Sequence, residues 1–259
     1  MAADYLTATF GLEGRTALIT GAASGLGYAI ACSLGNAGAR IVVNDLSDAI
    51  CAEAVEKLSA QGIAACGASF DVSDAHSVNE AVARLGHDGW KPDILVSNAG
   101  NQNRMPVVDQ APEAWQSLFD VHVNGAFNCV RAVLPHMLEK GDGRIILMSS
   151  VAALASMPGI SAYSAAKGAL AAFTRSLAVE YGGKGITSNA LAPGFVRTKF
   201  TVALQERDQF NDFLQDSVPL GRWAQPEDIA PAVVYLASRA GSFVNGHVLA
   251  IDGGLLAQM

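Results

Sequence analysis

Tyr163 and Lys167 are four positions apart in the run YSAAK. A helix would hold both side chains on one face, about 5 to 6 Å apart. A free tyrosine has a pKa of about 10 and is a poor base at neutral pH, but a nearby ammonium group stabilises the phenolate and lowers that pKa. Tyr163 is therefore expected to exchange a proton with a substrate oxygen. By itself such a pair is usually structural, so its meaning depends on its surroundings.

Two further motifs accompany this pair. Ser149 and Ser150 lie just past one predicted strand, and Ser150 precedes Tyr163 by 13 residues. Pro193 and Gly194 lie at the end of the next predicted strand. With these residues present, chance becomes a poor explanation for the tyrosine and lysine pair.

A glycine-rich run, TGAASGLG at 20–27, follows the first predicted strand and opens a helix. Its glycines permit a tight turn, bring the backbone close to a pyrophosphate and direct the helix N-terminus at its charge. A turn in any α/β protein can also require glycine, so the motif gains weight only from its context. The expected cofactor contacts here are Gly21, Ser24, Gly25, Leu26 and Gly27.

Asp45 stands at the end of the second predicted strand, 18 residues beyond Gly27. A carboxylate there can accept hydrogen bonds from the adenosine ribose hydroxyls and repel a 2′-phosphate. Ser24 is uncharged, and neither Leu46 nor Ser47 supplies a base that would pair with such a phosphate. These residues favour NAD over NADP, although an aspartate in this place is often only a turn or helix cap.

Polar residues also follow the third and fourth predicted strands, at the edge where doubly wound sheets bind ligands. The expected cofactor contacts here are Asp71, Val72, Asn98, Ala99 and Gly100. Two structural alternatives remain open: Asp71 could cap the helix that begins shortly after it, and Asn98 could brace the sheet by bonding to backbone groups.

Short β-branched runs alternate with longer helical segments along the chain. The predicted strands are 16–20, 40–44, 64–70, 93–97, 144–148, 186–191 and 247–251. Segments 49–61, 77–85, 115–138, 165–181 and 226–237 have apolar residues spaced by three and four, which predicts helices. Repeated strand and helix units predict an α/β fold with a doubly wound, Rossmann-type parallel sheet of about seven strands and helices on both faces.

One domain, 1–259, is expected, because no linker or compositional break divides the chain. The segment 198–219 is charged and aromatic and lies between a strand and a helix. We expect it to form a mobile cover over the site.

Taken together, these motifs resemble the short-chain dehydrogenase/reductase family from about Gly14 to Gly254. The resemblance rests on TGAASGLG, Asp71, NAG at 98–100, Ser150, YSAAK, PGFVRT and IDGG at 251–254, in the expected order and spacing. It implies an NAD(H)-dependent oxidoreductase that moves a hydride between nicotinamide and a secondary alcohol or ketone.

The resemblance also implies individual roles. Ser150 would polarise the substrate oxygen and Tyr163 would be the acid and base. Lys167 would hold the nicotinamide ribose hydroxyls and lower the tyrosine pKa, while Thr198 and the backbone near Val196 would bind the carboxamide. Pro193 and Gly194 belong to the same cofactor site.

His122 departs from the family pattern. The family usually has an asparagine three residues before a helical glycine, here Gly125, where it helps to hold a water in a proton relay. Asn124 would point elsewhere on the helix. His122 could bind the relay water, carry the proton itself, or leave the relay altered, and a buried helical histidine is often only a hydrogen-bonded core residue.

The substrate loops resemble gluconate 5-dehydrogenases and related sugar, sugar-acid and polyol dehydrogenases. The resemblance lies in residues 101–106, the region of Trp223 and residues 243–247. Gln102 and Arg104 could present hydrogen bonds and one positive charge to a polyhydroxylated acid, although an exposed arginine can equally form only a weak surface pair.

Alternative functions remain open. Reduction of 3-oxoacyl groups on acyl carrier protein generally uses NADPH, against which Asp45 argues, and no basic docking patch is evident. A hydroxysteroid dehydrogenase would need an apolar cover, where this chain has QERD at 205–208. A non-catalytic NAD sensor would not require Tyr163.

Composition limits the partners. A net charge of -7 without runs of like charge favours neither nucleic acid nor an anionic membrane surface. Four cysteines without zinc-binding spacing predict free thiols and no metal site, and the N-terminus lacks a signal-peptide pattern, which by default predicts a cytoplasmic protein. A small-molecule substrate is expected, and the family resemblance implies a homotetramer.

Overall fold

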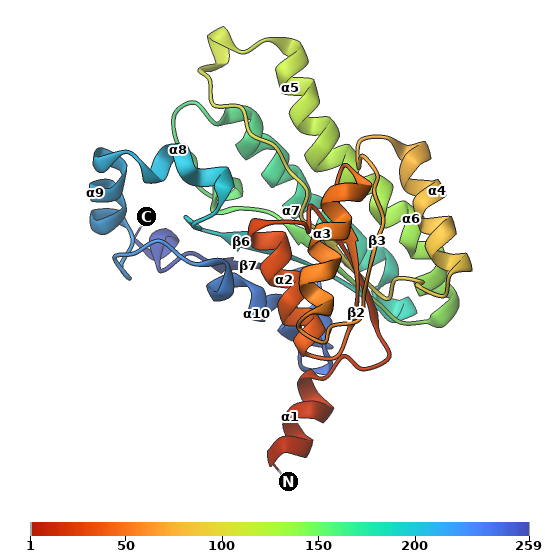
Figure 1. Ribbon diagram of the computed structural model, residues 1–259. Coiled ribbons are helices and arrows are strands. Elements are labelled where there is room, and N and C mark those ends of the chain that lie inside the picture. The colour runs from red at the N-terminus through yellow and green to blue at the C-terminus, as the bar shows by residue number, and fades with distance from the viewer. Residues whose placement is uncertain (1, 259) are drawn as a thin grey trace.

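Seven parallel strands form one central sheet in this computed structural model, which describes residues 2–258 (Figure 1). The strands are β1 (Thr16–Thr20), β2 (Arg40–Asn44), β3 (Ala65–Gly67), β4 (Ile94–Ser97), β5 (Gly143–Met148), β6 (Ile186–Pro193) and β7 (Val248–Ile251). Their order in the sheet is β3-β2-β1-β4-β5-β6-β7. The order reverses between β1 and β4, which opens a crevice at the carboxyl ends of these strands.

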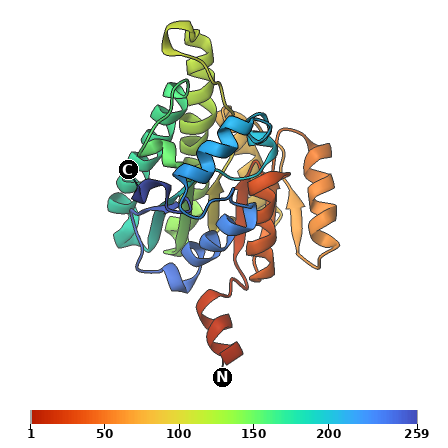
Figure 2. The ribbon, with the colours of Figure 1, turned by 90° about the vertical axis from the view of Figure 1, so that its left-hand side faces the viewer.

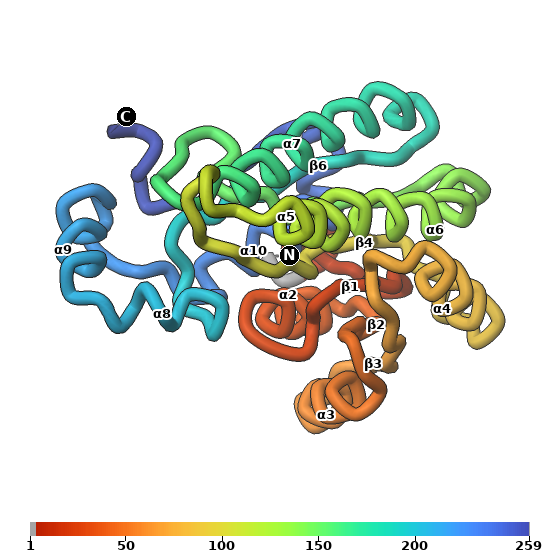
Figure 3. The backbone as a smooth tube through the Cα atoms, turned by 90° about the horizontal axis from the view of Figure 1, so that it is seen from above, coloured from red at the N-terminus to blue at the C-terminus, as the bar shows by residue number. Residues whose placement is uncertain are grey.

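Helices cover both faces of the sheet, as Figure 3 shows from above. Their bounds are α1 (Ala2–Phe10), α2 (Gly25–Asn36), α3 (Asp48–Ser59), α4 (Ala75–His87), α5 (Pro112–Phe119), α6 (Gly125–Lys140), α7 (Ser161–Tyr181), α8 (Val202–Gln205), α9 (Asp208–Ser217) and α10 (Pro226–Ala237). The core divides accordingly: α2, α3 and α10 pack on one face, and α4, α6 and α7 on the other. The expected doubly wound fold is confirmed.

Side-chain alternation along the strands fills both layers of the core. In β1, Ala17 and Ile19 enter one cluster while Leu18 enters the other, and all three are fully buried. Strands buried on both faces read as continuous apolar runs rather than as alternating ones. Such runs made the strands recognisable in the sequence.

The third strand is shorter than the expected 64–70. Beyond Gly67 the Asn44 side chain donates hydrogen bonds to the carbonyls of Ala68 (3.0 Å) and Phe70 (3.1 Å). The side-chain amide thus binds the carbonyls here, while the backbone N–H groups of Ala68 and Phe70 still donate to the carbonyls of Val43 (2.9 Å) and Asp45 (3.1 Å). The chain then turns toward the cavity described below.

The expected single helix over 115–138 is wrong in its middle. Residues 120–124 form a π-helical turn that joins α5 to α6. A π-turn inserts one extra residue into a helix and occurs frequently at functional sites. Here it carries His122 on its buried side.

The termini and the cover lie at the edges of the molecule. Helix α1, which the sequence did not predict, projects from the end opposite α5 (Figures 1 and 2). The predicted cover, 198–219, contains α8 and α9 (Figure 1). No helix within residues 2–258 has the length and hydropathy needed to cross a membrane.

Candidate active site

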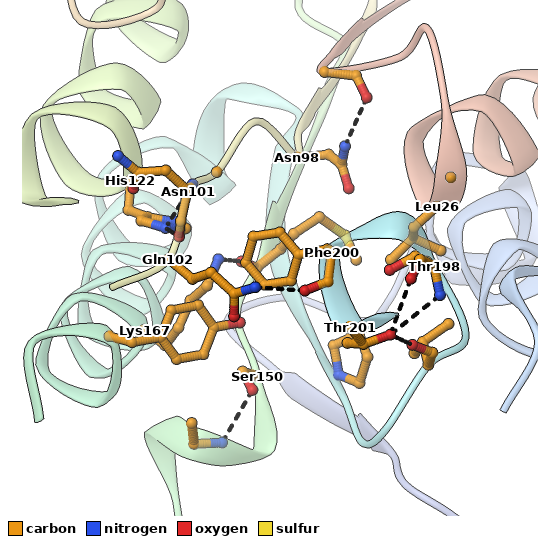
Figure 4. Close-up of a pocket in the computed structure, with 18 of the residues that line it drawn as sticks. Leu26, Asn98, Asn101, Gln102, His122, Ser150, Lys167, Thr198, Phe200 and Thr201 are labelled. Carbon is orange, nitrogen blue, oxygen red and sulfur yellow. Dashed lines mark hydrogen bonds between the residues drawn. The ribbon is translucent and has the colours of Figure 1, made fainter. Parts of the chain in front are cut away.

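A cavity of about 590 Å³ opens at the carboxyl ends of the strands. It extends from the glycine-rich turn after β1 to the cover at α8 and α9, and Figure 4 shows part of its lining. All of the candidate residues named above line it, and they are Gly21, Ser24, Gly25, Leu26, Gly27, Asp45, Asp71, Val72, Asn98, Ala99, Gly100, Gln102, Arg104, His122, Ser150, Tyr163, Lys167, Pro193, Gly194, Val196 and Thr198. The fold therefore gathers residues from six strand ends, α7 and the cover into one space.

The turn after β1 is shaped to receive a phosphate. Gly25 has a positive φ of 56°, and a Cβ on Gly27 would lie 2.2 Å from the carbonyl oxygen of Gly21. Among residues 2–258 the Ser24 side chain makes no capping hydrogen bond to α2. The first N–H groups of this helix are thus available to an anion, so the turn fits the pyrophosphate of a dinucleotide.

Asn98 braces this turn. Its Nδ2 donates to the carbonyl of Thr20 (2.9 Å) and, more weakly, to that of Gly21 (3.2 Å). The Thr20 hydroxyl accepts hydrogen bonds from the backbone N–H groups of Asn98 (2.9 Å) and Ala99 (3.0 Å). The prediction that Asn98 bonds to backbone groups is therefore confirmed. Its side-chain amide holds the loop after β4 against the glycine-rich turn after β1.

Asp45 presents its carboxylate at the rim of the cavity, where backbone groups fix it. One oxygen accepts from the N–H of Leu46 (2.9 Å) and the other from that of Ala23 (3.4 Å). Such a fixed carboxylate can still accept hydrogen bonds from ribose hydroxyls, because each oxygen has two lone pairs.

Asp71 does not cap the helix that follows it, so the interpretation of Asp71 as a helix cap is wrong. Its Oδ1 accepts from the N–H (2.8 Å) and hydroxyl (2.7 Å) of Ser73. Asp74 caps α4 instead, by accepting from the backbone N–H of His76 (2.9 Å). Asp71 thus forms a tight turn at the cavity wall.

The tyrosine and the lysine lie on consecutive turns of α7. Lys167 is buried, its Nζ lies 5.4 Å from the centre of the Tyr163 ring, and it donates to the carbonyl of Met148 (2.6 Å). Ser150 follows β5, and its Oγ accepts from the N–H of Ala152 (3.1 Å). Ser150 and the Tyr163 side chain both line the cavity.

Burial controls the electrostatics of this pair. We expected Lys167 to lower the pKa of Tyr163, but burial raises it, and the groups that lower it are Ser150 and the charge of Arg104. Burial also lowers the pKa of Lys167 to about 7. Both shifts have one cause, because a site closed to water disfavours the phenolate and the ammonium alike.

His122 lies beside this pair. Its ring stands edge-on to that of Tyr163, with centroids 5.6 Å apart, and its Nε2 is 2.8 Å from the carbonyl oxygen of Asn101. Asn124 is exposed and bonds to Asp120 (2.8 Å), so it points away from the site as expected.

The cover contacts the site through residues that the sequence argument missed. Phe200 places its ring 6.4 Å from that of Tyr163, and its carbonyl accepts a hydrogen bond from Gln102 Nε2 (Figure 4). Arg104 Nε donates to Gln102 Oε1 (3.3 Å). Lys199, beside Phe200, lines the cavity as well. An isolated aromatic in a loop carries no periodic signal, so only the folded chain reveals these contacts.

Comparison with known proteins agrees with this arrangement. A family model described as Enoyl-(Acyl carrier protein) reductase matches residues 21–256. The chain is 39% identical over 250 residues to a gluconate 5-dehydrogenase of Gluconobacter oxydans, covering 96% of this chain and 98% of the other. It is 38% identical to a 5-keto-D-gluconate 5-reductase of Escherichia coli, with coverages of 95% and 97%.

A solved structure is equally similar. The gluconate 5-dehydrogenase of Burkholderia cenocepacia, in complex with NADP and tartrate, has a TM-score of 0.95 and 39% identity, with 97% of this chain and 98% of the other covered. Likeness in both sequence and fold over nearly the whole length shows that the chain belongs to the short-chain dehydrogenase/reductase family of oxidoreductases.

Proposed function

We propose that this oxidoreductase transfers a hydride between NAD(H) and the secondary alcohol or ketone carbon of a sugar acid, with gluconate and 5-ketogluconate as the first candidates. The observation that carries the proposal is the convergence of Ser150 and Tyr163 on a cavity whose rim bears the Arg104 guanidinium. The similarity to gluconate 5-dehydrogenases supports the substrate class.

The chain's own residues supply binding and proton transfer in this proposal. A bound nicotinamide cofactor would supply the hydride chemistry. Tyr163 delivers a proton to the ketone oxygen, or removes one from the alcohol, while the Ser150 hydroxyl donates a hydrogen bond to that oxygen. Lys167 would hold the ribose hydroxyls of the nicotinamide half. Thr198 would bind the carboxamide.

Arg104 is proposed to bind the carboxylate of the substrate. Burial lowers the pKa of Arg104, the nearby Tyr163 raises it, and the charge of Arg207 lowers it further. An arginine next to Tyr163 matches a substrate whose carboxylate lies a few carbons from the reacting alcohol. The remaining polar groups of the loop at 101–103 suit hydroxyl groups.

Arg104→Met is expected to raise the KM for gluconate about tenfold, with a smaller effect on kcat. A tenfold change corresponds to a loss of about 1.4 kcal/mol of binding free energy. Steady-state kinetics with gluconate and with a neutral polyol would separate charge recognition from general damage. Arg84→Met, on exposed α4 outside the cavity, is the matched control. An equal rise in KM for the acid and the polyol would contradict the carboxylate role.

NAD is the proposed cofactor, although the similar Burkholderia enzyme was solved with NADP. The support for NAD is the Asp45 carboxylate, which backbone N–H groups hold at the rim of the cavity. A dianionic 2′-phosphate next to this carboxylate would be repelled.

Asp45→Asn keeps the shape of the side chain and removes its charge. The ratio of kcat/KM for NADP to that for NAD is expected to rise about tenfold, because one partly solvated charge repulsion is relieved. Asp48→Asn, three residues further on and outside the cavity lining, controls for a general change in charge. An unchanged ratio for Asp45→Asn would show that cofactor choice lies elsewhere.

One observation favours a second substrate class. The substrate half of the cavity also contains Met157, Ile160, Leu204 and Phe213, which suit an acyl chain. A panel of sugar acids, polyols, aldoses and a 3-oxoacyl thioester, with NAD(H) and NADP(H) in turn, tests the proposal through the absorbance of the reduced nicotinamide. Turnover of sugar acids supports it, turnover of the thioester alone replaces it, and cofactor binding without turnover supports a sensor.

A homotetramer and a cytoplasmic location complete the proposal. Phe127 on α6 is 50% exposed and Val179 on α7 is 87% exposed, which suits faces that pack between subunits. All four cysteines are free, as expected in a reducing compartment. The burial of Cys129 raises the pKa of its thiol to about 12, so this thiol is inert.

A further inference from the structure

His122 occupies a position between the catalytic helix and the loop that follows β4. The π-helical turn at 120–124 carries it inward, and its side chain is only 3% exposed. Its ring makes a T-shaped contact with that of Tyr163 on one side and a hydrogen bond to the backbone of the loop on the other. Figure 4 shows this placement next to Asn101 and Gln102.

The hydrogen-bond geometry selects one tautomer of the ring. Nε2 lies 2.8 Å from the carbonyl oxygen of Asn101 and 3.3 Å from the backbone nitrogen of the same residue. A neutral ring nitrogen cannot both donate and accept. The shorter contact therefore identifies Nε2–H as the donor to the carbonyl, which leaves Nδ1 without a protein partner among the described residues.

The loop backbone fits closely against the ring. A Cβ built on Gly100 would lie 2.5 Å from Cε1 of His122. This contact requires glycine at the start of the loop, and it lets the ring hold the loop through van der Waals contact as well as through the hydrogen bond to Asn101.

The loop carries the residues proposed to recognise the substrate. Gln102 follows Asn101 directly, and its amide links Arg104 to the carbonyl of Phe200 in the cover. A continuous chain of contacts thus runs from His122 through Asn101 to the substrate loop and the cover (Figure 4).

The charges around the ring keep it neutral. The titratable side chains that face it come from α7, and they are Lys167 and Tyr163. Burial and then the charge of Lys167 lower the pKa of His122 to about 3, although the Asn101 carbonyl opposes this shift. A ring that protonates only in strong acid is a poor proton carrier at neutral pH.

We infer that His122 is a positioning residue and does not carry the catalytic proton. Its Nε2–H fixes the Asn101 carbonyl, and this holds Gln102 and Arg104 in place to contact the substrate and the cover. This inference rests on the proposed function only for the identity of the substrate.

Two substitutions separate the alternatives. His122→Gln retains an N–H at about the distance of Nε2 and cannot carry a proton, whereas His122→Phe keeps a ring and loses the donor. We expect His122→Phe to raise the substrate KM about tenfold with a smaller change in kcat and an unchanged cofactor KM. His122→Gln should restore the substrate KM to within about threefold of wild type, with the same pH profile of kcat.

Hydrogen exchange provides a readout that needs no substrate. Peptides covering 101–110 and 198–205 should exchange faster in His122→Phe than in wild type, and at nearly wild-type rates in His122→Gln. A kcat loss with an altered pH profile in His122→Gln would overturn the inference in favour of proton transfer, and so would wild-type KM and exchange in His122→Phe. If no sugar acid is turned over, the proposed function fails, but the hydrogen-exchange rates still test whether His122 positions the loop. The two failures can therefore be distinguished.

Discussion

Tyr163→Phe is expected to lower kcat by about 10²- to 10⁴-fold, the range found when a general acid and base is removed. The phenol is the group that can deliver a proton to the reacting oxygen, since Ser150 is an alcohol and Lys167 faces Met148. The aromatic ring of the variant still fills its place against His122 and Phe200. The loss should therefore appear in kcat and leave the structure intact.

Three measurements make this expectation decisive. Initial rates give kcat, cofactor fluorescence titration should give a Kd within about threefold of wild type, and the thermal midpoint should shift by no more than about 2 °C. Tyr235→Phe on α10 is the control for a partly exposed tyrosine outside the cavity. Near-wild-type turnover by Tyr163→Phe would show that another group is the general acid and base.

Gly27→Ala is expected to abolish tight cofactor binding. A Cβ at this position would lie 2.2 Å from the Gly21 carbonyl oxygen and 2.7 Å from Nδ2 of Asn98. Neither group can yield freely, because Asn98 already bonds to Thr20 and the turn is closed. Overpacking of this kind costs about 1 to 3 kcal/mol and displaces the backbone that faces the phosphates.

The cofactor Kd of Gly27→Ala should rise more than tenfold, with a fall of about 2 to 10 °C in the thermal midpoint. Gly168→Ala on α7 is the matched control, because a Cβ there has open space and alanine favours a helix. The control should bind the cofactor as wild type does. Wild-type affinity in Gly27→Ala would mean that the turn does not hold the pyrophosphate.

The sheet could be predicted because each strand is marked by its own residues, without reference to distant parts of the chain. Strands buried on both faces appear as apolar runs such as Thr16–Thr20, and the polar residues after them mark one edge of the sheet. The end of the third strand could not be predicted, because beyond Gly67 a side chain, that of Asn44, binds the carbonyls of Ala68 and Phe70. The π-turn at 120–124 was missed because one inserted residue barely alters a helical period.

The candidate site was predicted wherever it depends on strand ends, and missed wherever it depends on contacts between loops. Asp45 and Asn98 follow strands and lie at the cavity. Phe200 contacts Tyr163 only because the cover packs over the cavity, and no residue spacing in the sequence predicts this packing. The raised pKa of Tyr163 was also unexpected, because burial depends on the whole fold.

Direct hydride transfer to the substrate carbon is the central claim, and a deuterium experiment tests it most directly. Reduced NAD that carries deuterium at both C4 positions of the nicotinamide would be incubated with 5-ketogluconate and the protein, and the product analysed by mass spectrometry and NMR. The account predicts a product that carries one deuterium on the former ketone carbon, formed by wild type and nearly absent with Tyr163→Phe. A product without deuterium, or no product from any ketone of the sugar-acid panel, would contradict it.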